Sequence, residues 1–345
     1  MQKSKIKMYL GFVLVLFVCV LFFSLKDNFK DILYNLCHVN IMWLIVGIAF
    51  VFSSKYFIGL TTYELGIKEN KNLSLSKVIQ IALIYPFYAG ITPSSIGGEG
   101  FEIFYLKQCG ISYGGGTNIQ MQKFILYEIS LLSINTLVVI LNFFTGIVVD
   151  SSFVGSAVTL NFIVNLVLLG GGFLITYNKW IKNFILNSGV NILSKIRIIK
   201  EPDRFRDRID DFLVNFDEGA KTLHKDKKLF SKLIIYNLLS IFFLILAAWP
   251  VARAMHIKEI GIGNLFILAA YAKMMCLLVV TPGNSGAAEY CFIYLFTGLI
   301  SEDGIMAYML IWRVVTYYIP LVTGGAVAML WERRRVREET IGTES

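Results

Sequence analysis

Two matching stretches of the chain place a helix-breaking proline, a glycine and a glutamate inside strongly apolar sequence. They are Thr92, Pro93, Gly97 and Glu99 in the first stretch, and Thr281, Pro282, Gly286 and Glu289 in the second. Proline lacks an N–H and clashes with the preceding helical turn, so each stretch should end one helix and begin another. A half-helix that begins inside a membrane presents free N–H groups and a positive dipole end, which favour an anion such as a lipid phosphate. The alternative is that proline and glycine only kink these helices, as they often do in membrane segments.

Other charged residues in apolar sequence are candidates for the same site. Glu102 follows the first stretch, Lys273 precedes the second, and Lys55 and Arg313 lie in separate apolar segments. Charged groups at membrane depth are costly, so they pair, protonate or contact a substrate. The glutamates could meet a cationic head group or carry a proton. The cations could contact the substrate or neutralise the glutamates, and both alternatives stay open here.

The composition identifies a polytopic membrane protein. Of the 345 residues, 56% are apolar and 16% are charged, and several apolar runs are long enough to cross a membrane. The net charge of +8 comes mainly from the N-terminus, a central linker and the C-terminus, the segments expected to be cytoplasmic. We therefore expect both termini in the cytoplasm, and no nucleic-acid partner.

No enzyme or metal motif is recognisable in the sequence. The five cysteines form no C-x-x-C pair, and the three histidines share no metal-ligand spacing. Walker-type phosphate loops, nucleophile elbows and H-E-x-x-H motifs are missing from the sequence. We therefore expect no catalytic residue, no metal site and no cofactor.

The apolar pattern predicts an all-α fold of about six full spans and two broken hairpins. The predicted spans are 8–25, 41–63, 124–149, 153–177, 229–252 and 305–331, and the hairpins are 77–107 and 262–300. These elements form an N-terminal membrane half, 1–177, and a C-terminal half, 229–332. A cytoplasmic linker, 178–228, joins them, and 333–345 form a cytoplasmic tail. The linker contains an amphipathic helix, which could lie on the membrane surface or pack on the bundle.

The two hairpins should enter the membrane from opposite sides. The first arm, of roughly 14 residues, makes a helix of about 21 Å, too short for a hydrocarbon core of about 30 Å. With all basic regions in the cytoplasm, the number of crossings places the first hairpin open to the cytoplasm and the second open to the exterior. Inverted repeats with broken helices are typical of transporters. Both arms of the second broken segment could also span the membrane fully. Two full crossings return the chain to the same side as a re-entrant hairpin does, so the basic residues do not separate these two cases.

The segments Thr92–Glu99 and Thr281–Glu289, with Arg313, Tyr317 and Pro320, resemble the lysylphosphatidylglycerol synthase transmembrane-region family. The similarity covers nearly the whole chain. Within that family, the chain resembles the flippase half of the multiple peptide resistance factor. The chain departs from the family pattern at Ser94 and Ser95, and at Glu128, which stands without the family's usual Glu-Arg pair.

The resemblance implies a flippase of the bacterial cytoplasmic membrane that moves a phospholipid between leaflets. In that family the lipid is notably aminoacylated phosphatidylglycerol such as lysyl-phosphatidylglycerol, whose transport contributes to antimicrobial peptide resistance. A separate soluble domain transfers the amino acid, and we expect none here because the chain ends at Ser345, soon after its last span. The alternatives are a phosphatidylglycerol lysyltransferase acting with a separate aminoacyltransferase, and an accessory subunit of a lipid or glycosyl transferase.

Overall fold

The computed structural model describes residues 38–90, 92, 97–149, 151–178, 180, 202–276, 284 and 286–344. Every regular element in these ranges is a helix, and one isolated β-bridge joins Thr297 to Ile300. The predicted all-α class is therefore confirmed. The predicted span 8–25 and much of the linker lie outside the described ranges.

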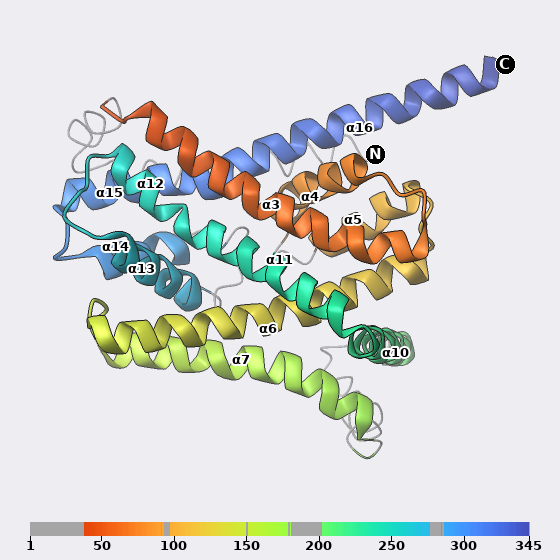
Figure 1. Ribbon diagram of the computed structural model, residues 1–345, viewed down its shortest axis with the longest axis horizontal. Helices are drawn as coiled ribbons and strands as arrows, with labels where there is room; N and C mark the ends of the chain where they lie inside the picture. Colours follow the sequence, from red (N-terminus) through yellow and green to blue (C-terminus); the bar gives the residue numbers. More distant parts are fainter. Residues whose placement is uncertain are drawn as a thin grey trace.

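Five helical segments in the described ranges are long and apolar enough to cross a membrane. They are α3 (Ile41–Glu69), α6 (Tyr113–Thr145), α7 (Ser152–Tyr177), α11 with α12 (Lys227–Leu246 and Ala248–Ala254), and α15 with η5 and α16 (Glu302–Arg313, Val314–Tyr318 and Ile319–Glu344). Five of the six predicted spans are thus found. The sequence predicts that the last span ends at Trp331, but helix α16 continues and projects beyond the bundle (Figure 1).

Side-chain caps fix where the long helices begin. Asn40 Oδ1 accepts a hydrogen bond of 3.0 Å from Met42 N at the start of α3, and Ser112 Oγ accepts one of 3.0 Å from Gly115 N in α6. Asp226 caps α11 in the same way, and the Leu229 N–H together with Lys68 holds the pKa of this carboxyl below its usual range. These bonds satisfy backbone donors that a helix start leaves free.

Each predicted break separates two short helices that pack against each other. The first hairpin consists of α4 (Leu75–Gly90) and α5 (Gly97–Gln108), and the second of α13 (Ile262–Met275) and α14 (Ala287–Phe296). The longest of these, α4, has 16 residues and is about 24 Å long, too short to cross a core of about 30 Å. The expected pair of broken hairpins is therefore present.

The two hairpins open at opposite ends of the bundle. At the end where α3 stops and α11 starts, which we call the linker end, Asn70 Nδ2 donates to Cys109 O just after α5, at 2.9 Å. At the other end, which we call the turn end, Asn40 N donates to Ala254 O just before α13, at 2.8 Å. Because α3 runs from one end to the other, α4 and α5 open at the linker end and α13 and α14 at the turn end (Figure 1). The predicted inversion is confirmed.

Cysteines placed at Gly114 and Gly263 should be modified from opposite sides of the membrane. Both glycines are exposed, in the first turns of α6 and α13, and a Cβ at either position would meet nothing within 4 Å. In a variant without other cysteines, an impermeant maleimide added to intact cells should label Gly263→Cys at once. It should label Gly114→Cys only after the membrane is opened. Labelling of both from one side would contradict the inverted arrangement.

Two apolar clusters fill the bundle, one around each hairpin. Phe292, Phe296 and Tyr308 belong to the second-hairpin cluster, and Ile81 and Ile84 belong to the first-hairpin cluster. Helices α3, α6 and α11 contribute residues to both clusters, and each of these helices has a stretch that lies between the two clusters. Polar side chains occupy these stretches and form what we call the central polar layer: Ser54 and Lys55 on α3, Glu128 on α6, and Asn237 and Ser240 on α11.

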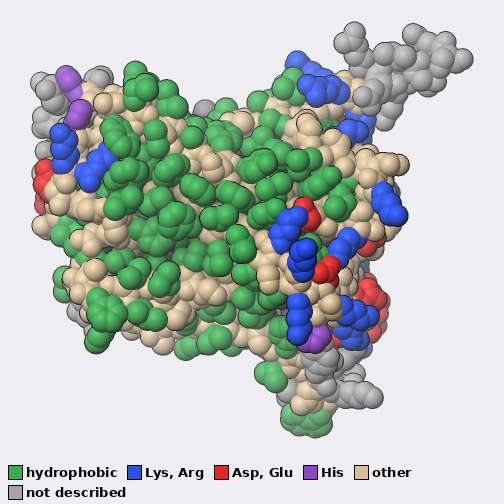
Figure 2. All heavy atoms as spheres, in the orientation of Figure 1, with side chains coloured by type: hydrophobic (Ala, Val, Ile, Leu, Met, Phe, Trp, Pro, Cys, Tyr) green, Lys and Arg blue, Asp and Glu red, His purple; other side chains and the backbone are tan. Residues whose placement is uncertain are grey.

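The outer surface has the opposite arrangement, with charged ends and an apolar middle. Figure 2 shows a broad band of hydrophobic side chains, with Lys, Arg, Asp and Glu gathered mainly toward the linker end. Helix α10 (Pro202–Lys225) lies at that end and packs on α6, α7 and α11. A Cβ added at its Gly219 would lie 3.2 Å from Gln122 Cγ on α6. The part of the linker described here therefore contacts the bundle.

Replacing Gly324 by alanine should destabilise the protein, because α16 packs closely on α4 there. A Cβ at Gly324 would lie 2.6 Å from the backbone oxygen of Leu83, which no side-chain rotation relieves. Overpacking of this kind costs roughly 1–3 kcal/mol. Unfolding in mixed detergent micelles should show that loss, whereas Gly170→Ala, where a Cβ meets nothing within 4 Å, should change stability far less. Equal effects of the two substitutions would contradict close packing at Gly324.

Candidate functional site

The second hairpin carries a buried ion pair. Arg313 Nε lies 2.8 Å from Glu289 Oε1, and the two side chains are 7% and 8% exposed. The other carboxylate oxygen, Glu289 Oε2, accepts a hydrogen bond of 2.6 Å from Gly286 N, at the start of α14. Gly286 has a φ of 89°, which glycine adopts without strain. Because Glu289 takes up this N–H, this donor is not available to an external anion.

Tyr317 connects that ion pair to the end of the first hairpin. The Arg313 guanidinium lies 4.6 Å from the centre of the Tyr317 ring, a cation–π contact. The Tyr317 hydroxyl donates a hydrogen bond of 3.1 Å to Gly90 O, the last residue of α4. Tyr317 lies in η5, a single π-helical segment between α15 and α16, and such segments are frequent at functional sites. Arg313 and Tyr317 therefore link the ion pair of the second hairpin to the end of α4 in the first.

The first hairpin carries two acidic residues with different surroundings. Glu102 is 3% exposed, forms an ion pair with Lys123 of α6, and accepts a hydrogen bond of 3.1 Å from Thr62 Oγ1. Glu99 is exposed and accepts a hydrogen bond of 2.8 Å from the Tyr85 hydroxyl. Glu102 is thus neutralised by a neighbouring lysine, whereas Glu99 is an exposed residue beside the break.

Lys55 and Lys273 form a pair of like charges in the interior. Lys55 is the middle residue of α3, and Lys273 lies close to the inner end of α13. They are near enough to repel each other electrostatically, and both are partly buried. Within the described part of the chain, neither has a carboxylate partner. Two partly buried cations without a described carboxylate partner give this region a positive potential that an anion would neutralise.

The breaks themselves are only partly described. Thr92 follows α4, and its hydroxyl donates a hydrogen bond of 2.8 Å to Tyr88 O, so it satisfies the helix end. Gly97 is the first residue of α5. Pro93, Thr281 and Pro282 lie outside the described residues.

Several buried polar residues that lie near the second break were not identified from the sequence. Asn161 Nδ2 donates to Met274 O near the end of α13, at 3.1 Å, and Asn135 Nδ2 donates to Asn161 Oδ1, also at 3.1 Å. Asn165 Nδ2 donates to Asn161 O at 2.7 Å. These three buried asparagines fix the position of the helix end that carries Lys273. The signal that could have found them is amide side chains inside apolar spans, which hydrogen-bond across membrane helices.

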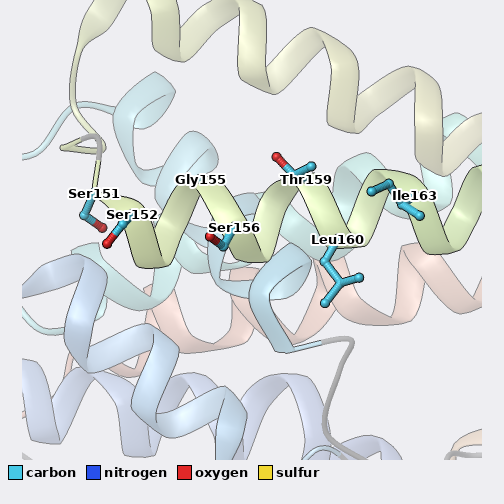
Figure 3. Close-up of a pocket in the computed structure, with 7 residues that line it drawn as sticks. All are labelled: Ser151, Ser152, Gly155, Ser156, Thr159, Leu160 and Ile163. Atoms are coloured by element: carbon cyan, nitrogen blue, oxygen red, sulfur yellow. The ribbon is translucent and has the colours of Figure 1, made fainter.

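A groove of about 640 Å³ lies away from these residues, on α7 at the turn end. Figure 3 shows Ser152, Ser156 and Thr159 along this helix, with Leu160 and Ile163 further on. Leu160 and Ile163 are 42% and 50% exposed, as expected for side chains that face lipid. None of the predicted site residues lines this groove.

Comparisons with known proteins agree with the architecture. The sequence matches the family described as Lysylphosphatidylglycerol synthase TM region over residues 8–324. It is also similar to a UPF0104 membrane protein of Archaeoglobus fulgidus, with 22% identity over 295 residues, which cover 82% of this chain and 85% of that protein. Both matches extend over most of the chain.

Proposed function

Because this chain belongs to the lysylphosphatidylglycerol synthase TM-region family, a family of membrane proteins, we propose that it moves a phospholipid between the leaflets of a bacterial cytoplasmic membrane. The linker end faces the cytoplasm in this proposal, since basic residues concentrate there. No part of the proposed step needs a catalytic residue or a cofactor.

The observation that carries the proposal is the presence of Lys55 on α3 and Lys273 on the second hairpin, two partly buried cations without a carboxylate partner in the described part of the chain. A phospholipid head group has a phosphate whose charge would neutralise the two cations, and lysine binds phosphate as a point charge. Lys55 belongs to the central polar layer, and Lys273 lies near the inner end of the hairpin that opens at the turn end. A head group held there would be about halfway between the two leaflets.

The hairpins give a means of exposing that position to each side in turn. Transporters built from inverted repeats alternate access by moving one half against the other around a fixed site. In this protein the hydrogen bond from Tyr317 to Gly90 O is one of several that join the two halves, with those of Ser54 to Ser240 and of Asn237 to Thr61, and movement of the halves would change these contacts. Glu99, accessible beside the first break, would meet a cationic group on the same head group.

Lipid movement in proteoliposomes tests the proposal. Vesicles of phosphatidylglycerol and phosphatidylethanolamine would contain a trace of head-group-labelled fluorescent phosphatidylglycerol, and an impermeant reductant would bleach the outer leaflet. With the protein present, the protected inner fraction should also be lost over time. The same protected fraction in protein-containing and protein-free vesicles would defeat the proposal. If instead lipid became aminoacylated when charged tRNA was added, an enzyme function would replace it.

A further inference from the structure

Glu128 is a buried carboxyl that the proposed phosphate site does not use. It lies at the middle of α6, the span Tyr113–Thr145, and is 6% exposed. Its Oε2 atom is buried and has no hydrogen-bond partner among the described residues. Leu126 belongs to the first-hairpin cluster and Leu131 to the second, so Glu128 stands where α6 passes from one to the other.

Helix α6 contacts both hairpins, through α5 and through α13, and it also contacts α3, α7, α10 and α11. Away from the helix ends, the charged side chains on these neighbours and on α6 are Lys55, Glu64, Glu99, Glu102, Lys123, Lys232 and Lys273. Lys123 pairs with Glu102, and Lys232 pairs with Glu64. Helix α7 carries no acidic or basic residue, and the charges of α10 lie at the linker end. In the described part of the chain, none of these charged side chains forms an ion pair with Glu128.

An ionised carboxylate without a cation or hydrogen bonds is strongly unfavourable in an apolar interior. The surroundings of Glu128 therefore favour the neutral form of its carboxyl. If the halves moved and water reached the centre of the bundle, the ionised form would become stable and the proton would leave. The protonation state of Glu128 would then follow the position of the two halves.

We propose that Glu128 is a proton-binding site that couples lipid movement to the transmembrane proton gradient. A hydronium ion from one aqueous phase gives its proton to the carboxylate, the neutral acid is carried through the closed state, and water on the other side receives the proton. The inference rests on the proposed function, because it names the energy source of that same transport.

The test compares wild-type protein with Glu128→Gln, Glu128→Asp and the exposed control Glu302→Gln in proteoliposomes, with and without a pH gradient. A gradient should speed lipid movement severalfold in the wild type, in Glu128→Asp and in Glu302→Gln. In Glu128→Gln, which keeps the size of the side chain and loses the proton site, the rate should not respond to the gradient. Infrared spectra of the purified protein should contain the carbonyl band of a protonated carboxyl at neutral pH that Glu128→Gln lacks.

The outcomes separate the two proposals. Lipid movement that responds equally to the gradient in wild type and Glu128→Gln, or that never responds, overturns the coupling and leaves the lipid transport intact. A Glu128 carboxyl that is ionised at neutral pH in the infrared spectra also overturns it. Vesicles in which no variant moves lipid defeat the proposed function, and the coupling with it.

Discussion

Replacing both Lys55 and Lys273 by glutamine should lower the apparent affinity for a phospholipid about 100-fold or more. A hydrogen bond to a charged group contributes roughly 1.5–3 kcal/mol, and about 1.4 kcal/mol corresponds to a factor of ten. Loss of two such contacts with one phosphate would therefore almost abolish lipid movement at ordinary lipid content. The rate of fluorescence loss in proteoliposomes, measured against lipid fraction, gives the size of the effect.

The same double substitution should leave the protein at least as stable as the wild type. Removing two like charges relieves their mutual repulsion and the cost of burying them. The matched control is Lys227→Gln with Lys258→Gln, two exposed lysines, which should move lipid at the wild-type rate. Normal lipid movement by the Lys55→Gln and Lys273→Gln double variant, or a loss of activity caused only by unfolding, would contradict the assignment of a phosphate site to these lysines.

Replacing Arg313 by methionine should destabilise the protein by about 3–5 kcal/mol. The substitution leaves the Glu289 carboxylate buried without its cation, and removing one partner of a buried pair has a cost of this size. It also removes the guanidinium that lies over the Tyr317 ring. The midpoint of unfolding in mixed micelles, as the denaturing detergent is increased, measures the loss.

A second substitution shows whether Arg313 acts by neutralising Glu289. Adding Glu289→Gln to Arg313→Met removes the unpaired charge and keeps an oxygen to accept the Gly286 N–H, so most of the lost stability should return. Lipid movement should return with it if the pair is structural. A double variant that is as unstable as Arg313→Met would show that the pair is not what Arg313 contributes.

The broad architecture could be predicted because it depends on local sequence. The helix breaks were expected from proline chemistry at Pro93 and Pro282, which lie outside the described residues, and the inversion was expected from where basic residues anchor the spans. Both depend on rules that act over a few residues or on charge at the ends of spans.

The pairings within the site could not be predicted, because they depend on packing between distant segments. Glu289 is paired by Arg313 and not by Lys273, and Glu102 is paired by Lys123, which the sequence prediction did not single out. The Tyr317 hydroxyl contacts Gly90, a residue 227 positions away. The sequence shows which charges are at membrane depth, but the crossing of helices decides which of them neutralise each other.

The central claim is that a phospholipid head group occupies the interior between the two hairpins. A phosphatidylglycerol analogue with a photoactivatable group beside its phosphate tests this directly, when it is irradiated in proteoliposomes and its adducts are located by mass spectrometry. We predict adducts on α3 near Lys55 and on α13 near Lys273, and their loss in the double glutamine variant. Adducts confined to lipid-facing residues such as Leu160 and Ile163 of α7, and unchanged in that variant, would contradict the claim.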